Sequence, residues 1–432
     1  MFGRARAYEP PVGGTPVRLE AVPTPAARTG TNLAANAAWL LGSNIAYAAC
    51  QWGAVVALAK FSHPEALGYF GLALAVTNPI VLVTSFALKA YQSTDVRGRY
   101  AFADYMNLRL AANVVAAIMV GAIIAVGVVT GTAGAVLVPV AVAKLADATS
   151  ETCYGVAQKH ERMRFVAIAK TLRGALGLLG LAAVIVFGGS VVSGAWALAA
   201  AWTGFLLAVE LPYAGLLESP FGAPHAHVLW RLARETAPLG GVAGVVALTQ
   251  SLPRYLLQLT EGAAAVGYYT ALASVVPVVS HLAAAVGNAS APRLGWAVLS
   301  DTRRYRGLVR GLTAVAAVAS IVLALGTAAF GGWFLRVAYA PDYAAYERTL
   351  VLVVIAAGFG VVNTITYFAL VAVRRVGFLF AIYSAGMVAT GIVGVVLIPR
   401  FGLDGAAIGA IVGAAVTAVL GARAALSGGG AR

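Results

Sequence analysis

Long apolar segments recur along the whole chain, and they constrain its fold more than any other feature. A helix of about 20 mainly apolar residues crosses the hydrocarbon core of a bilayer. Twelve segments qualify, at 34–58, 66–88, 108–129, 133–155, 166–187, 191–215, 238–259, 264–289, 308–330, 348–372, 376–398 and 404–424. Only 11% of the residues are charged, against about 25% in soluble domains. The sequence therefore predicts an all-α polytopic membrane protein with about twelve transmembrane helices.

Basic residues are concentrated in every second loop between these segments. Those loops contain Arg97, Arg99, Lys159, Arg162, Arg164, Arg231, Arg234, Arg303, Arg304, Arg306, Arg374 and Arg375. The intervening loops are short and nearly free of charge. Because Lys and Arg accumulate in cytoplasmic loops, we predict that both termini are cytoplasmic. The net charge of +14 then reflects membrane topology, and no nucleic-acid partner is expected.

The ends and cysteines of the chain carry little chemical information. Residues 1–32 are polar and rich in proline, and they lack the apolar core of a secretory signal. We therefore expect a disordered cytoplasmic tail. Cys50 and Cys153 lie far apart in apolar stretches, so they indicate neither a disulfide framework nor a metal site.

Residues 51–69 and 250–268 form a weak internal repeat. Both stretches begin with Gln and end with Gly-Tyr, and an apolar run follows each of them. The offset between them is 199 residues. Both glutamines fall in odd-numbered segments, so the repeats run in the same direction, as in two-lobed transporters. Chance similarity between Gly-rich and Ala-rich helices is the alternative. The polar stretch 217–236 is the natural cytoplasmic linker between predicted six-helix lobes at 33–216 and 237–425.

No catalytic signature is recognisable in the sequence. The histidines have neither the spacing of metal ligands nor a nucleophile beside them; they are His63, His160, His225, His227 and His281. We expect a protein that is not an enzyme and that has no cofactor or metal.

Ionisable residues inside the apolar segments are the most informative feature. Charges at membrane depth are costly and usually face the bundle interior or water. Lys144, Asp147 and Glu151 are spaced i, i+3 and i+7, so they share one helix face. We predict that this face points inward. The alternative is that the helix ends early and these residues are a solvated terminus.

Five further cations are candidates for an anion-binding interior. Lys170 and Arg173 lie one turn apart, and Lys89 and Arg109 flank two segments near the cytoplasmic side. All four would also serve as snorkelling topology anchors. Arg254 directly follows Pro253 within a segment, where proline often marks a cavity wall. It is the best single candidate for an anionic ligand, and a buried pair with a carboxylate is the alternative.

These cations outnumber the intramembrane carboxylates identified above. Arg and Lys bind phosphate groups well, so a pyrophosphate-bearing substrate is favoured over a cationic drug.

Several stretches resemble the polysaccharide flippases of the multidrug/oligosaccharidyl-lipid/polysaccharide exporter superfamily. They are "QWGAVVALAKFSHPEALGYFGLALAVTNPI", "KAYQSTDVRGRYAFADYMNLRL", "KLADATSETCYGVAQKHERMRFVAIAKTLRGALGLL" and "LPRYLLQLTEGAAAVGYYTALASVVPVVSHLAAAVGNASAPRLGWAVLSD". The resemblance covers nearly the whole chain after residue 30. It implies two six-helix lobes around a central cavity.

The resemblance also implies a function: movement of a lipid-pyrophosphate-linked oligosaccharide across a bacterial inner membrane by alternating access. The cations would hold the pyrophosphate, and Asp147 or Glu151 would bind H⁺ or Na⁺. A multidrug antiporter of the same superfamily, a membrane glycan polymerase or ligase, and an unrelated sugar or ion transporter are the alternatives.

Overall fold

The computed structural model describes residues 30–95, 98–300, 302–373 and 376–428. Within those ranges all regular secondary structure is helical, as the apolar segments predict. Except for residues 30–32, the predicted tail lies outside the described residues.

The first half of the chain supplies six membrane-crossing units. Two of them are broken: a short helix follows the second unit, and a π-helical turn interrupts the sixth. The elements are α1 (Gly30–Phe61), α2 (Pro64–Thr84), α3 (Leu88–Thr94), α4 (Phe102–Ala125), α5 (Gly131–Lys159), α6 (Met163–Val186), α7 (Val191–Phe205), η1 (Leu206–Glu210) and α8 (Leu211–Leu217).

The second half supplies six more units. Its last helix contains a break at Gly402, where φ is +53°, a conformation that glycine adopts without strain. The elements are α9 (Ala226–Thr260), α10 (Ala263–Ala273), α11 (Val276–Ser300), α12 (Thr302–Ala338), the 3₁₀ turn η2 (Pro341–Tyr346), α13 (Glu347–Ala372) and α14 (Val376–Gly428).

The prediction of about twelve transmembrane helices is confirmed. Among the described residues, nine helices or broken helices are long and apolar enough to cross a membrane. The pair within α14 counts there as one, and α1 and α9 are not among the nine. Those two helices carry polar side chains such as Gln51 and Gln250, which lower their hydropathy. They are also the two helices that the 199-residue offset relates.

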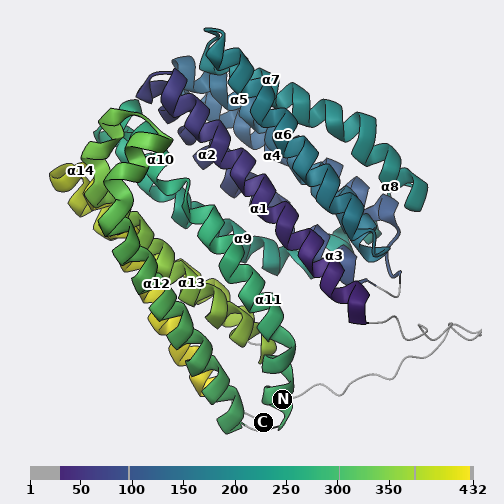
Figure 1. Cartoon of the computed structure of the whole chain (residues 1–432). Coiled ribbons are helices and arrows are strands. Elements are labelled where there is room, and N and C mark those ends of the chain that lie inside the picture. The colour runs from purple at the N-terminus through teal and green to yellow at the C-terminus, as the bar shows by residue number, and fades with distance from the viewer. Residues whose placement is uncertain (1–29, 96–97, 301, 374–375, 429–432) are drawn as a thin grey trace, which may run out of the picture.

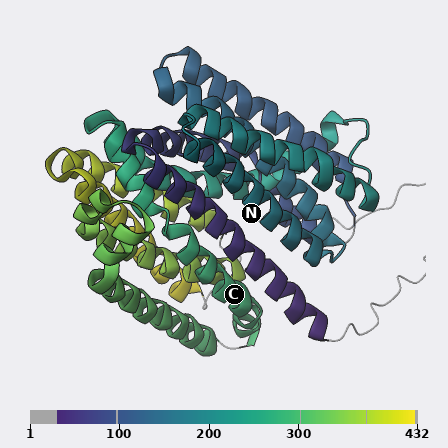
Figure 2. The same cartoon turned by 45° about the horizontal axis from the view of Figure 1, so that its top comes forward.

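The helices form two groups, one from α1 to α8 and one from α9 to α14 (Figure 1). In the first group α6 packs on α1 and α7, and α5 packs on α2 and α7. In the second, α13 packs on α12 and α14, and α9 packs on α14. The groups meet where α10 lies beside the start of α2, and they diverge toward the start of α1 and the end of α11 (Figures 1 and 2). The exact lobe bounds stay a prediction; between the groups, the stretch without helix is 218–225.

Glycines of the internal repeat touch each other where the two groups meet. A Cβ atom on Gly68 would overlap the carbonyl oxygen of Ala263, and one on Gly267 would overlap the carbonyl oxygen of Pro64. The residues in each of the pairs Gly68/Gly267 and Pro64/Ala263 are 199 positions apart. A reciprocal contact of this kind is what a twofold axis between two repeats produces.

Substituting Gly68 with Ala tests whether this contact holds the two groups together. The added methyl would meet a carbonyl of the other group, and overpacking typically costs about 1–3 kcal/mol. We expect a clear fall in the thermal unfolding midpoint in detergent. Gly204→Ala is the control, because nothing lies within 4 Å of a Cβ there. An unchanged midpoint for Gly68→Ala would show that the contact carries no stability.

Candidate functional site

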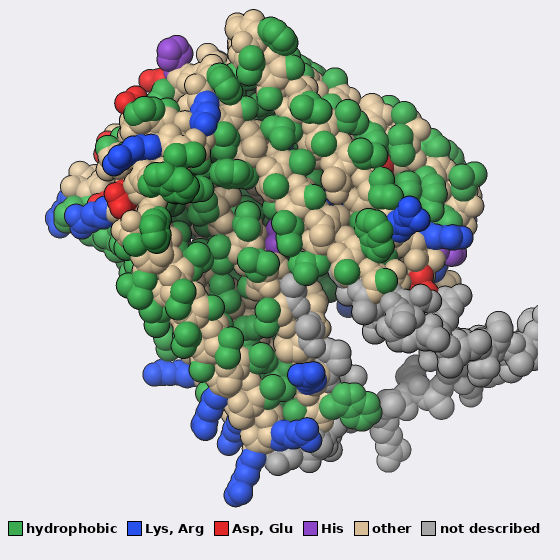
Figure 3. Space-filling model, viewed as in Figure 1, with side chains coloured by type: hydrophobic (Ala, Val, Ile, Leu, Met, Phe, Trp, Pro, Cys, Tyr) green, Lys and Arg blue, Asp and Glu red, His purple; other side chains and the backbone are tan. Residues whose placement is uncertain are grey.

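A central cavity of about 730 Å³ lies between the two groups of helices. The surface is hollowed between the groups (Figure 3). The polar lining of the cavity comes from both groups: Gln51, Asn78, Lys144, Thr249, Gln250, Arg254, Thr270, Ser274, Ser280, His281, Asn363, Thr364, and Thr417. Among the described residues that line it, Lys144 and Arg254 are the strong cations, and none is Asp or Glu.

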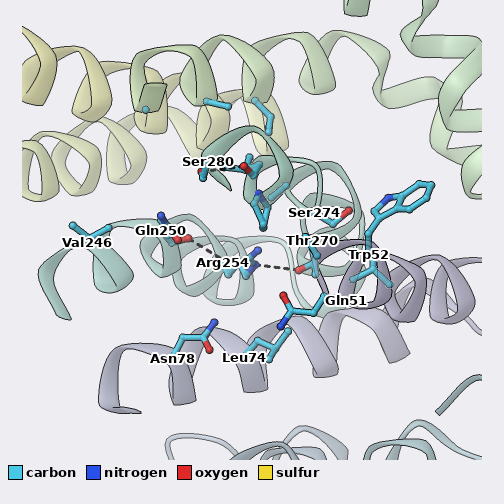
Figure 4. Close-up of a pocket in the computed structure, with 18 of the residues that line it drawn as sticks. Gln51, Trp52, Leu74, Asn78, Val246, Gln250, Arg254, Thr270, Ser274 and Ser280 are labelled. Atoms are coloured by element: carbon cyan, nitrogen blue, oxygen red, sulfur yellow. Dashed lines mark hydrogen bonds between the residues drawn. The ribbon is translucent and has the colours of Figure 1, made fainter. Parts of the chain in front are cut away.

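Arg254 lies on α9 with its guanidinium at the cavity wall. Its Nε donates to Thr270 Oγ1 at 3.2 Å, and Nη1 donates to the carbonyl of Gln250 at 3.4 Å. Gln51 and Asn78 reach toward the same space from α1 and α2 (Figure 4). In the described part of the chain no carboxylate forms a salt bridge with Arg254. A full positive charge therefore faces the cavity with neutral partners only.

Lys144 is the second cation of the lining, contributed by α5. Its Nζ lies 6.0 Å from the centre of the Trp202 ring. Asp147 and Glu151 follow it on α5 but are absent from the described cavity lining. The predicted polar face is therefore divided between the cavity and the interior of the first group.

Glu151 belongs to a charge cluster inside the first group of helices. Lys89 Nζ lies 2.6 Å from its Oε2, and Lys170 Nζ lies 3.7 Å from its Oε1. Lys170 also donates to Asn44 Oδ1 at 2.9 Å. Two ammonium groups and one carboxylate thus form the outer part of this cluster.

Arg173 forms the inner part of the same cluster. Its Nη2 lies 2.5 Å from Asp147 Oδ1, and its Nε lies 3.9 Å from Glu210 Oε1. The Tyr47 hydroxyl donates to Asp147, and the Tyr154 hydroxyl donates to Glu210. The side chains of Arg173 and Glu210 are completely buried, at 0% exposure. The aromatic rings of Tyr47, Tyr154 and Trp202 surround the guanidinium at 5.3–5.6 Å.

Arg109 is buried away from both the cavity and this cluster's ion pairs. Its Nε donates to Thr152 Oγ1 at 3.2 Å, and Nη2 donates to the Ser85 carbonyl at 3.0 Å. Ser85 follows the end of α2, and its carbonyl also accepts the backbone N–H of Leu88 at 3.0 Å. Arg109 therefore binds the turn between α2 and α3 instead of extending to the surface as a snorkelling anchor.

The structure thus separates the candidate residues. Arg254 and Lys144 line the cavity, whereas Lys89, Lys170, Arg173, Asp147 and Glu151 lie together in the first group. Glu210 escaped the sequence analysis, although it lies in the apolar run "LLAVELPYAG". The criterion that selected Asp147, a carboxylate at membrane depth, would also have selected it. Gln51 and Gln250 were noticed only as repeat markers.

Aromatic side chains close the cavity at the end where the two groups meet. Trp52 Nε1 donates to the Tyr339 hydroxyl at 2.9 Å, which joins α1 to the chain after α12. The Tyr339 hydroxyl also lies 2.8 Å from Ser274 Oγ. Tyr343 is buried against Tyr339 and Tyr268. These described side chains pack directly against one another in this conformation.

At the opposite, diverging end, described residues of α3 and α9 connect the two groups. The Tyr91 hydroxyl on α3 donates to Glu235 on α9 at 2.5 Å. This hydrogen bond holds the pKa of the Glu235 carboxyl below its usual value, against a smaller opposing effect of burial. α2 packs extensively on α9, whereas the equivalent contact in the repeat, that of α1 with α11, is far smaller. The cavity is therefore least enclosed between α1 and α11.

Comparisons with known proteins agree with this architecture. A family model described as "Polysaccharide biosynthesis protein" matches residues 33–296. The capsular polysaccharide biosynthesis protein CapF of Staphylococcus aureus is 26% identical over 141 residues, which cover 33% of this chain and 35% of CapF. The chain thus matches about a third of the length of that relative.

Solved multidrug transporters of the MATE family share the fold. The MATE multidrug transporter DinF-BH superposes with a TM-score of 0.67 at 14% identity, covering 91% of this chain and 94% of that one. An inward-facing MATE transporter gives 0.63 at 13% identity, covering 91% and 94% of the two chains. An outward-facing one gives 0.58 at 13% identity, covering 92% and 96%. With the family match, this fold confirms the resemblance to the exporter superfamily. The chain belongs to the polysaccharide biosynthesis protein family.

Proposed function

We propose that this protein is a flippase that moves a polyprenyl-pyrophosphate-linked oligosaccharide between the leaflets of a bacterial inner membrane by alternating access. The observation that carries the proposal is the charge of the central cavity. Its described lining offers Lys144 and Arg254 without a carboxylate, so it attracts anions and repels cations. Family membership supports an intermediate of polysaccharide biosynthesis as the cargo.

Arg254 and Lys144 would bind the pyrophosphate. The Arg254 guanidinium has no carboxylate partner among the described residues, so a phosphate would not compete with a salt bridge for it. Charge-assisted hydrogen bonds to phosphate are roughly twice as strong as neutral ones. The two cations come from different groups of helices, so a bound pyrophosphate would contact both halves of the protein.

The sugars would occupy the neutral polar part of the cavity. Gln51, Asn78, Gln250 and Asn363 line it with amide groups, each of which both donates and accepts hydrogen bonds. Such groups suit the hydroxyls of a glycan. The polyprenyl chain would extend from the cavity into the surrounding lipid through the weakly packed side between α1 and α11.

Both chain termini would be cytoplasmic. Because the start of α1 lies at the diverging end of the bundle (Figure 1), that end would face the cytoplasm. The conformation described would then accept cargo from the cytoplasmic leaflet. Translocation would require the aromatic contacts around Tyr339 to separate and the diverging end to close. Coupling of transport to an ion bound in the charge cluster that contains Asp147 and Glu151 remains part of the proposal.

The multidrug antiporter is a weaker alternative. The described lining includes aromatic side chains such as Trp52, Trp202 and Tyr383, which could contact a drug, but it has two cations and no carboxylate that would attract a cationic one. A glycan polymerase would need groups that activate a sugar hydroxyl, and His281 is the one histidine of the described lining.

Substituting Arg254 with Gln tests the pyrophosphate site. Losing hydrogen bonds from a charged group costs about 1.5–3 kcal/mol, which corresponds to about a 10–100-fold rise in Kd. We expect that rise for a polyprenyl pyrophosphate carrying a short oligosaccharide, measured by thermophoresis in detergent. Arg348→Gln is the matched control, since that side chain is 81% exposed and pairs with Asp404. Equal losses in both variants, or none in Arg254→Gln, would contradict the assignment.

The native cysteines allow an independent test of where the cargo sits. Cys50 lines the cavity, whereas Cys153 is fully buried. A hydrophilic maleimide should therefore label the wild type once, and Cys50→Ser should abolish labelling while Cys153→Ser should not. Added cargo should slow labelling in proportion to the fraction of protein occupied. Unchanged labelling at saturating cargo would place the cargo outside this cavity.

A further inference from the structure

The charge cluster inside the first group of helices divides into two sets with opposite imbalance. Glu151 contacts both Lys89 and Lys170, so the outer set carries one surplus positive charge. Arg173 lies between Asp147 and Glu210, so the inner set carries one surplus negative charge if both carboxyls are ionised. The inner set is the more deeply buried, because Arg173 and Glu210 are both 0% exposed.

A single proton would neutralise the inner set. The six groups of the two sets would sum to zero if all were ionised, but the two lysines are paired with Glu151, and the two inner carboxyls share Arg173 as their cation within 4 Å among the described residues. A buried carboxyl without a cation of its own is costly to ionise and commonly becomes neutral instead. Glu151 is a poor proton acceptor by the same argument, since two ammonium groups stabilise its charge. The proton therefore belongs on Asp147 or on Glu210.

The contacts of the two carboxyls distinguish them. Asp147 receives Nη2 of Arg173 at 2.5 Å and the Tyr47 hydroxyl, and it retains 21% exposure. Glu210 receives the Tyr154 hydroxyl, its distance to Arg173 exceeds hydrogen-bonding range, and its Oε2 makes no hydrogen bond to another described protein group. Asp147 thus has the environment of a carboxylate and Glu210 that of a carboxylic acid.

Arg173 also has N–H donors that are free to bind either carboxyl. Its Nε and Nη1 are buried and make no hydrogen bond to another described group. Glu210 is the last residue of the π-helical turn η1, and such turns are frequent at functional sites. A small rotation of the guanidinium would exchange its bond to Asp147 for bonds to Glu210.

The titratable and charged groups around Glu210 come from four helices. α5 contributes Asp147, Glu151, Cys153 and Tyr154, α6 contributes Lys170 and Arg173, and α1 contributes Tyr47. α3 contributes Lys89, whose Nζ lies 5.6 Å from the centre of the Tyr154 ring. The sequence of α7 holds no titratable residue, and Tyr213 of α8 stacks on Phe165 instead. Arg173 is therefore the one cation whose nitrogen approaches Glu210 within 4 Å among the described residues.

We propose that Glu210 is a proton-binding site and that Arg173 is a switch, which changes its carboxyl partner when Glu210 gains or loses the proton. With the proton on Glu210, Arg173 pairs with Asp147, as in the conformation described. When the proton leaves to water, the Glu210 carboxylate draws the guanidinium away from Asp147. One proton is bound or released for each exchange.

The exchange would reach the cavity through Asp147. Lys144 lies three residues before Asp147 on α5, so the two side chains are neighbours on the helix surface. Asp147 without Arg173 is free to pair with Lys144 and to withdraw that cation from an anionic cargo. Proton release at Glu210 would then favour cargo release. This last step rests on the proposed function, whereas the proton site does not.

Infrared difference spectroscopy of the full-length protein, without cargo, tests the proton site. Titration from mildly acidic to mildly alkaline pH should remove one band of a buried carboxylic acid in the wild type. Glu210→Gln should lack that band, whereas Glu151→Gln and Glu218→Gln should retain it. Tyr154→Phe should shift its frequency, and it reports on the site even if Glu210→Gln does not fold. A band that persists in Glu210→Gln, or that stays unshifted in Tyr154→Phe, would overturn the proposal.

Electron–electron distance measurements test the switch. Spin labels at Thr94→Cys and Gly307→Cys, with Cys50 replaced by Ser, report the separation of the two groups at the diverging end. We expect this distance to change with pH in the wild-type background and to lose that change in Glu210→Gln. The Glu218→Gln control, whose carboxyl pairs with Lys159 and His160 at a helix end, should keep it. A pH response that survives Glu210→Gln would refute the switch and leave the flippase proposal untouched, because no cargo is present.

Discussion

The cost of placing a charge in a bilayer determines how this protein uses its polar residues. Such a charge must be paired inside the protein or must face a water-filled space. In the first group of helices, Lys89, Lys170 and Arg173 meet three acidic side chains. At the cavity, Arg254 and Lys144 meet none among the described lining residues. The first arrangement pairs charges inside the fold, and the second creates a cavity that favours anions.

The internal repeat explains why the cavity lies where it does. The repeat-related helices α1 and α9 both carry cavity-lining glutamines, and the glycines on α2 and α10 bring the two halves into backbone contact. The halves nevertheless differ in charge. Arg254 has its repeat equivalent at Val55, 199 residues earlier. The charge cluster that contains Asp147, Arg173 and Glu210 lies wholly in the first half. The symmetric scaffold thus carries two asymmetric features, a cationic cavity and a buried charge cluster in one half, for which we propose anion binding and proton binding.

Sequence reasoning recovered the helices better than the site. The bilayer imposes a length and an apolarity that every spanning helix must satisfy, so twelve segments could be read directly. Even α1 and α9 were found, although their glutamines reduce their hydropathy. The two lining cations were predicted, but helical periodicity could not separate Lys144 from Asp147 and Glu151. The partner of a charged side chain depends on how the helices pack. The pairing of Lys170 on α6 with Glu151 on α5 therefore could not be predicted from the sequence. Glu210 was missed because its apolar neighbours gave no local pattern, and the π-helical turn shifts the helix phase around it.

In the function we propose, the cavity carries an anionic lipid-linked glycan from one leaflet to the other. The most direct test is translocation of a fluorescent polyprenyl-pyrophosphate oligosaccharide in proteoliposomes that contain the purified protein. An enzyme confined to the outside, which cleaves the glycan only in the outer leaflet, reports the fraction that has crossed. We predict that the protein exposes the inner-leaflet pool to cleavage while the glycan keeps its length. A pool that stays protected, while the same vesicles export a cationic dye or lengthen the glycan, would contradict the account.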